Sequence, residues 1–257
     1  MELIQNSDII NQIEQSMPDI LRCSSDKLLL EPFEKDFSMR FCWSSNAIEG
    51  NTLSLEETVS VIEYDEVQSG HTYSEYRDAK NLYQSVQKMM IPFQKRELTE
   101  EWIKNANGYI RGVRGEYRKG KVYIGSLVEA VHYPPDPERV PELMKSHFEK
   151  WNHSYTGKNL SEKMELFAGE HIEFESIHPF QDGNGRVGRM LLSQRMINEG
   201  LLPIAVSPTG KYRRAFQRYE KHGDLSQMVH EICKAEEEAI NRIQTLAKKR
   251  LLQEDVL

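Results

Sequence analysis

Helical periodicity is the feature that most constrains the fold of this sequence. In residues 56–67 and 73–90, apolar side chains recur every three or four positions with charged residues between them. This spacing places the apolar side chains on one face of an α-helix. Further helices are expected at 140–151, 161–177, 185–199 and from 225 towards the C-terminus. The sequence therefore predicts an all-α fold.

Local signals mark where several of these helices begin and end. Ser54 and Glu57 have the spacing of a capping box, in which each side chain bonds the other residue's main-chain amide. Ile91 precedes a proline, and this position disfavours helical geometry, so a helix should end there. Thr99 is a suitable N-cap for the next helix.

One stretch, residues 115–133, departs from the helical pattern. Val122, Tyr123 and Ile124 are β-branched or aromatic, and Gly125 follows them. This composition predicts a short β-hairpin that stands off the helical body. Residues 134–137, which contain three prolines, predict a stiff extended connection after it.

Charge and composition exclude several functions. The net charge of −7 argues against a non-specific nucleic-acid binder, because such proteins carry a basic excess. The 3 cysteines are too few and too scattered for a disulfide framework or a zinc site. No apolar run approaches the roughly 20 residues that span a bilayer, and no signal peptide is recognisable. We expect a cytoplasmic protein with no membrane partner.

The chemistry is concentrated in residues 177–189, IHPFQDGNGRVGR, which lie between two predicted helices. Gly183 and Gly185 permit a tight turn that directs successive amides towards one point at the start of the second helix. Such a nest binds anions. Arg186 and Arg189 are three residues apart and project from one helical face, where their planar guanidinium groups suit phosphate oxygens.

Two further side chains complete a reactive site. Asp182 is a hard oxygen ligand for Mg²⁺ beside the phosphate site. His178 is the nearby side chain whose pKa suits removal of a hydroxyl proton near neutral pH. The stretch therefore predicts phosphoryl or nucleotidyl transfer.

Three other interpretations of the same residues fit the sequence less well. Residues 183–188 fit the dinucleotide fingerprint G-x-G-x-x-G, but that motif requires a preceding strand, and 173–179 does not have the pattern of one. Residues 175–178 have the E-x-x-H form of helical di-iron sites, yet no second copy occurs. A purely structural loop is disfavoured because arginines at a helix N-terminus oppose its macrodipole.

The stretch resembles the signature of the Fic family, H-x-F-x-[DE]-G-N-G-R-x-x-R, and matches it at each fixed position. The resemblance covers residues 37–224 and implies a helical core, a hairpin called the flap, and AMP transfer from ATP to a hydroxyl of a target protein. It implies His178 as general base, Phe180 as structural anchor and Asp182 as Mg²⁺ ligand. It also implies nucleotide-binding roles for the remaining signature residues: Gly183, Asn184, Gly185, Arg186 and Arg189.

Residues 45–50, SNAIEG, resemble the inhibitory motif [ST]-x-x-x-E-[GN] of the same family. Ser45 and Glu49 are four apart and would share one helical face. The resemblance implies that Glu49 pairs with Arg189 and displaces the γ-phosphate, because a carboxylate and a phosphate compete for one guanidinium group. Its position upstream of the signature implies a class with an N-terminal inhibitory helix. An exposed turn is the alternative for this segment.

One departure affects the base-binding region. Many relatives carry a tyrosine pair and an asparagine there, and the alignment places Arg213, Arg214 and Lys221 at those positions. A donor other than ATP is therefore an alternative, and a solvated helix face is the simplest interpretation of these basic residues.

The sequence thus predicts three regions: 1–97 with the inhibitory motif, a Fic core at 98–224, and a helical extension at 225–257. The expected function is that of an autoinhibited protein adenylyltransferase that modifies Ser, Thr or Tyr of target proteins and of itself. De-AMPylation and a non-enzymatic nucleotide-binding module are the alternatives. A homodimer is a possible assembly.

Overall fold

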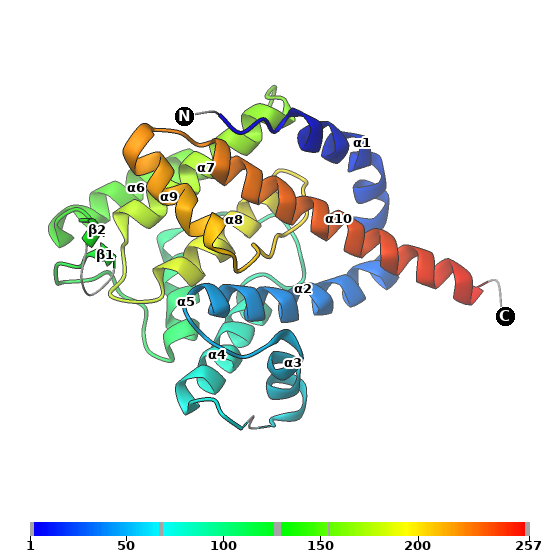
Figure 1. Ribbon diagram of the computed structural model, residues 1–257, viewed down its shortest axis with the longest axis horizontal. Helices are drawn as coiled ribbons and strands as arrows, with labels where there is room; N and C mark the ends of the chain where they lie inside the picture. The colour runs from blue at the N-terminus through cyan, green and yellow to red at the C-terminus, as the bar shows by residue number, and fades with distance from the viewer. Residues whose placement is uncertain (1–2, 67–68, 126–129, 154, 255–257) are drawn as a thin grey trace.

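The computed structural model describes residues 3–66, 69–125, 130–153 and 155–254, and within them it is mainly helical (Figure 1). The expected all-α class is confirmed. The α-helices are α1 (Ser7–Ser24), α2 (Lys27–Ile48), α3 (Leu55–Tyr64), α4 (Tyr73–Met89), α5 (Glu100–Arg111), α6 (Val140–Trp151), α7 (Leu160–Ile177), α8 (Asn184–Asn198), α9 (Gly210–His222) and α10 (Ser226–Glu254). A 3₁₀ turn, η1 (Pro137–Arg139), precedes α6.

The predicted helix starts are confirmed where a cap was named. Ser54 and Glu57 form the capping box of α3, with both reciprocal bonds present. The Thr99 side chain accepts from the amide of Trp102 at the start of α5. In the N-terminal region the structure has two long helices, α1 and α2, whose bounds the sequence pattern did not indicate. Asp26 caps α2 through the Leu28 amide, and α2 then continues unbroken to Ile48, so the inhibitory motif lies at its C-terminal end.

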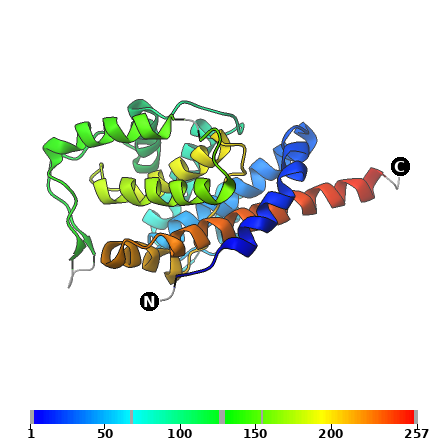
Figure 2. The ribbon, with the colours of Figure 1, turned by 90° about the horizontal axis from the view of Figure 1, so that it is seen from above.

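The two larger buried clusters of the helical body meet at α8. One cluster joins α1, α7 and α10 around residues such as Ile13, Phe167 and Met228. The other joins α2, α4, α5 and α8 around residues such as Phe41 and Ile103. α8 lies in the middle of the molecule and α10 runs across it, with its C-terminal end projecting beyond the body (Figures 1 and 2). Because α8 is packed from several sides, its first turn is held in a fixed position.

The expected hairpin is present at one end of the molecule (Figure 1). Strand β1 (Ile124–Gly125) pairs antiparallel with β2 (Ala130–His132), with Ile124 opposite His132. Val122 and Tyr123 come before the strand, and the Tyr123 side chain is 52% exposed. No helix among the described residues is long and apolar enough to cross a membrane.

Candidate active site

The loop between α7 and α8 has an unusual backbone at each end. His178 follows the last turn of α7 with a φ of 50°, in the left-handed region that a side chain with a Cβ rarely adopts. Gly183, with a φ of 86°, is the N-cap of α8. The first amides of α8 have no acceptor within the helix and are available to an anion, as the sequence predicts.

Two buried side chains hold this loop from inside. The phenyl ring of Phe180 is 1% exposed, so it lies where an anchor is expected. The Asn184 amide bridges the loop, because its Oδ1 accepts from the Phe180 amide and its Nδ2 donates to the Phe180 carbonyl, both at 2.8 Å. The Asn184 side chain is thus engaged with the loop backbone.

A hydrogen bond to the backbone of α7 orients the His178 imidazole. Its Nδ1 lies 3.2 Å from the Glu175 carbonyl oxygen, which can only accept, so Nδ1 carries the proton and Nε2 is left with a free lone pair. Burial lowers the pKa of His178 below its ordinary value, and the nearby Arg118 cation acts in the same direction, although the bond to Glu175 opposes both. The imidazole is therefore neutral near pH 7.

His178 lines a hollow of about 600 Å³ between the end of α2, the hairpin, α7, α8 and α9. Predicted site residues from distant parts of the sequence meet there: Glu49, Ile124, His178, Gly185 and Arg189.

Arg189 is bound on one side by the end of α2. Its guanidinium is 3% exposed and donates from Nε to Ser45 Oγ at 2.8 Å and from Nη2 to the Ser45 carbonyl at 3.0 Å. Nη2 also contacts Glu49 Oε1 at 2.6 Å. Burial disfavours ionisation of Glu49, but the Arg189 cation, with Arg186 and Arg213, holds the pKa of Glu49 below its usual range. Ser45 is buried within α2, whereas Glu49 and Gly50 form an exposed turn at its end, and Glu49 contacts Arg189 from that turn.

Arg186 and Asp182 lie next to each other but have different partners. Arg186 Nη2 is 3.7 Å from Asp182 Oδ1, and Arg186 Nη1 is 3.4 Å from Asp78 Oδ2 on α4. Asp182 also forms an ion pair with Arg111 on α5. These groups thus pair with α4 and α5, whereas Arg189 pairs with α2.

No group of three or more His, Cys, Asp or Glu side chains that could hold a metal is found among the residues that the structure describes. A site built by protein ligands alone is therefore not seen in that part of the chain. A single carboxylate beside a polyphosphate site is nevertheless a fitting donor for Mg²⁺, which keeps several waters and takes one or two carboxylates together with substrate phosphates. Asp182 meets that description.

The sequence did not identify several residues of the hollow. Glu175 is 9% exposed, and burial raises its pKa to about 8, with the Glu49 charge adding to the rise and Arg189 opposing it. Tyr212 bonds His171 at 2.6 Å, and its ring centroid lies 5.8 Å from the Arg189 guanidinium carbon. The E-x-x-H spacing did single out Glu175, but for a different chemistry.

The three basic residues of α9 that replace the expected base-binding side chains, Arg213, Arg214 and Lys221, are all exposed, as a solvated face requires. Arg213 differs in one respect, because its side chain also lines the hollow and donates to the carbonyl of Ile48, at the C-terminal end of α2.

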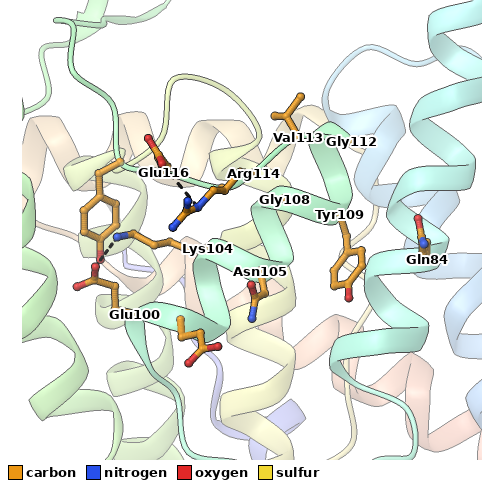
Figure 3. Close-up of a pocket in the computed structure, with 13 residues that line it drawn as sticks. Gln84, Glu100, Lys104, Asn105, Gly108, Tyr109, Gly112, Val113, Arg114 and Glu116 are labelled. Atoms are coloured by element: carbon orange, nitrogen blue, oxygen red, sulfur yellow. Dashed lines mark hydrogen bonds and ion pairs between the residues drawn. The ribbon is translucent and has the colours of Figure 1, made fainter.

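A second hollow, of about 970 Å³, lies beside α5 and the segment that follows it (Figure 3). Four of its charged side chains pair locally: Lys104 pairs with Glu100, and Arg114 Nε is 3.7 Å from Glu116. None of the predicted site residues lines it. The smaller hollow is therefore the candidate active site.

The loop between the two buried helices presents an imidazole and the first amides of α8, an arrangement suited to phosphate. Residues 97–195 match the Fic/DOC family. Over these residues the chain is therefore similar to Fic-domain proteins.

Two curated relatives are proteins called protein adenylyltransferase Fic. The one from Aedes aegypti is 25% identical over 90% of this chain and 46% of its own length. The one from Drosophila erecta is 26% identical over 92% of this chain and 50% of its own length. The chain thus spans about half the length of these relatives.

Solved structures share the fold. A Fic-domain-containing signaling protein from Bacteroides thetaiotaomicron superposes with a TM-score of 0.78 at 21% identity, covering 93% of this chain and 97% of that protein. Fic-1 from C. elegans superposes with a TM-score of 0.76 at 21% identity, covering 94% of this chain and 72% of that one.

Proposed function

We propose that this chain is an autoinhibited protein adenylyltransferase that transfers AMP from ATP to a Ser, Thr or Tyr hydroxyl of target proteins, itself included. The observation that carries the proposal is the meeting of His178, with Nε2 free, and Arg189 in one hollow at the N-terminus of α8. The names of the insect relatives support AMP as the transferred group.

The reaction follows from these positions. Nε2 of His178 takes the proton of the target hydroxyl, whose oxygen attacks the α-phosphorus of ATP. A phosphorus–oxygen bond forms as the bond to the β-phosphate bridging oxygen breaks, and pyrophosphate leaves with those electrons. The amides of Gly183, Asn184 and Gly185 face the phosphates, and Arg186 and Arg189 hold the β- and γ-phosphates. Asn184 acts through its main chain, since its side chain holds the loop. Catalysis is positioning plus electrostatic stabilisation.

Asp182 would hold Mg²⁺ in this scheme. When bound, the ion would supply positive charge that offsets the negative charge of the phosphate oxygens. In the present structure a cation, Arg111, occupies the Asp182 carboxylate. Arg111 would have to give up this contact when Mg-ATP binds.

Glu49 is the proposed inhibitory residue. It contacts the same Arg189 nitrogen that donates to the Ser45 carbonyl, and that guanidinium is needed by the γ-phosphate. Because a carboxylate and a phosphate oxygen cannot occupy one donor position, ATP binds unproductively while Glu49 stays in place. Ser45 keeps Arg189 turned towards α2.

The hairpin is the proposed target-binding flap. Residues Val122 to Gly125 would pair with an extended target segment through their main chain. His132 on β2 contacts Glu220 on α9 at 3.3 Å and the Ser176 carbonyl on α7 at 3.1 Å, so the second strand is fixed beside the hollow. The division into an inhibitory region (1–97), a transferase core (98–224) and an extension (225–257), which would serve a homodimer, is part of the same proposal.

A different nucleotide donor is the second candidate, and one observation favours it. Arg213 lines the hollow at the place where the resemblance expects the adenine-binding tyrosines. A guanidinium group has hydrogen-bond donors and no acceptor. The carbonyl oxygen of a guanine or pyrimidine base could accept from it, whereas adenine has no carbonyl.

One adduct assay separates these functions. The Glu49→Gly variant is incubated with Mg²⁺ and each nucleoside triphosphate in turn, alone and in lysate, and intact protein mass is measured. We expect an AMP adduct with ATP, and none in Glu49→Gly/His178→Ala. An adduct of another mass identifies another donor. ATP binding without any adduct would establish the non-enzymatic module instead.

A further inference from the structure

Arg118 is the buried cation that ties the hairpin to the catalytic loop. Its side chain is 4% exposed. On one side Nε donates to the His178 carbonyl at 2.8 Å, and Nη2 reaches the Ile177 carbonyl at 3.4 Å. On the other side Nη1 donates to the Gly120 carbonyl at 3.1 Å, and Nη2 donates to the Pro135 carbonyl.

The partners of Arg118 are therefore main-chain carbonyls from two elements. Those of Ile177 and His178 lie at the C-terminal end of α7, where the helix dipole is negative and a cation is favourable. Gly120 precedes β1 and Pro135 follows β2, so the same guanidinium holds both ends of the hairpin. The main-chain amide of Arg118 adds a bond to the Pro179 carbonyl at 2.9 Å.

We propose that Arg118 is a positioning residue for the transfer reaction: its guanidinium fixes the left-handed backbone of His178 and holds the flap at a set distance from that base. This inference rests on the proposed function. His178 has a φ of 50°, a conformation that surrounding structure must enforce. Arg118 binds the carbonyl of that same residue, so it acts directly on the strained peptide.

The charge of Arg118 contributes a second effect on the base. A cation near an imidazole disfavours the imidazolium form, so Arg118 helps burial to lower the pKa of His178. Loss of that charge alone raises the His178 pKa. The acid limb of the pH–rate profile, which follows the His178 pKa, then moves to higher pH.

The planar fork of arginine is essential to this role. Its five donors spread over one plane and can serve carbonyls on opposite sides. A lysine keeps the charge, but its three donors radiate from one nitrogen. Arg118→Lys therefore separates geometry from charge, and Arg118→Gln removes the charge.

The test uses the Glu49→Gly background, in which transfer is measurable, and a matched control. Arg195 is equally buried, at 4% exposure, and bonds Glu199 at 2.9 Å and the His153 carbonyl at 2.8 Å, outside the hollow. Arg195→Lys therefore removes an equivalent buried guanidinium without touching the loop. For each variant, kcat, the KM for Mg-ATP and the midpoint of thermal unfolding are measured.

We expect Arg118→Lys to lower kcat about 100-fold with the KM for Mg-ATP changed less than about threefold, because a displaced base costs rate rather than nucleotide affinity. Arg195→Lys should lower the unfolding midpoint comparably and leave kcat within about twofold. Equal kcat in the two lysine variants, at equal loss of stability, would reduce Arg118 to a structural residue and overturn the proposal.

A spectroscopic arm keeps this inference separate from the proposed function. Nitrogen-15 shifts of the His178 ring report its tautomer and pKa with no transfer required. Arg118→Lys should mix the two tautomers, and Arg118→Gln should raise the pKa. Unchanged shifts in both variants would refute the positioning role even in an active enzyme. Absence of any adduct from Glu49→Gly alone, with shifts that move as expected, would refute the transferase function and leave the positioning role standing.

Discussion

The two hollows of this protein differ in the way that separates a reactive site from a surface depression. The hollow beside α5 is the larger, at about 970 Å³ against about 600 Å³, but its charges pair locally along one helix and the adjoining segment. The hollow between the end of α2, the hairpin, α7, α8 and α9 is lined by residues from all five of these parts, including the buried Arg189 and the partly buried His178. Convergence of groups from distant parts of the sequence marks it as the candidate active site, and size does not.

Replacing His178 tests this contrast most strongly. In the Glu49→Gly background, His178→Ala should lower the rate of adduct formation by about 10³-fold or more, since general-base catalysis contributes about 10² to 10⁴. Time-resolved intact mass spectrometry with Mg-ATP measures the rate. ATP affinity, measured by calorimetry, should be retained. A variant that keeps its rate would show that the base lies elsewhere.

Removing the Glu49 carboxylate should act in the opposite direction. Glu49→Gly should raise the rate of AMP transfer by about 10- to 100-fold, the equivalent of one charge-assisted hydrogen bond. Glu49→Gln keeps the size without the charge, so its rate should fall between those of the parent and Glu49→Gly. The same adduct assay checks this order. A reversed order would mean that Glu49 supports the transfer reaction.

The buried acid Glu175 predicts a pH dependence of stability. Its pKa is raised to about 8 in the folded state, so the folded protein holds a proton that the unfolded chain has already released by pH 6. This contribution is complete below pH 4 and is lost as pH rises to 8. Glu175→Gln should remove a slope of about 1 kcal/mol per pH unit between pH 5 and 8. Urea unfolding at several pH values measures it, and parallel curves for parent and variant would contradict the assignment.

Arg213 should have a smaller effect that depends on Glu49. It bonds the last carbonyl of α2 and helps to keep Glu49 ionised, so Arg213→Ala should loosen the inhibited arrangement. A cation at a helix terminus contributes up to about 1 kcal/mol, which corresponds to at most about a fivefold rise in transfer rate in the otherwise unchanged chain. In Glu49→Gly the same substitution should have no such effect. A fall in both backgrounds would instead place Arg213 in nucleotide binding.

The hollow beside α5 should tolerate substitution. Lys104→Ala removes a partly exposed ion pair with Glu100, and such pairs contribute about 0 to 1 kcal/mol to stability. The transfer rate of Glu49→Gly/Lys104→Ala should stay within about twofold of Glu49→Gly. A larger loss in the adduct assay would show that this second hollow takes part in the reaction.

Much of the fold could be predicted because its signals are local. The helices after Ser54 and Thr99 begin where these caps indicate. The turn at residues 183–185 depends on glycine, because Gly183 has a positive φ at the N-cap of α8. The signature residues lie within one short stretch, residues 177–189, so their relative positions follow from this local backbone.

The remainder of the site depends on contacts between distant segments. Arg189 meets Glu49 across 140 residues of sequence, and only the resemblance could indicate that pair. The pairing of Arg186 with Asp78 and the reach of Arg118 to four carbonyls had no signal at all, because no local pattern records which cation is buried.

The contact between Glu49 and Arg189 depends on the absence of a side chain at Gly185. A Cβ at this position would collide with Glu49 Oε1 and lie 3.0 Å from Arg189 Nη1. The space of one absent methyl group therefore accommodates the Glu49 carboxylate. Under the proposed function, a larger residue at position 185 would displace that carboxylate and would also crowd the place where substrate oxygens approach α8.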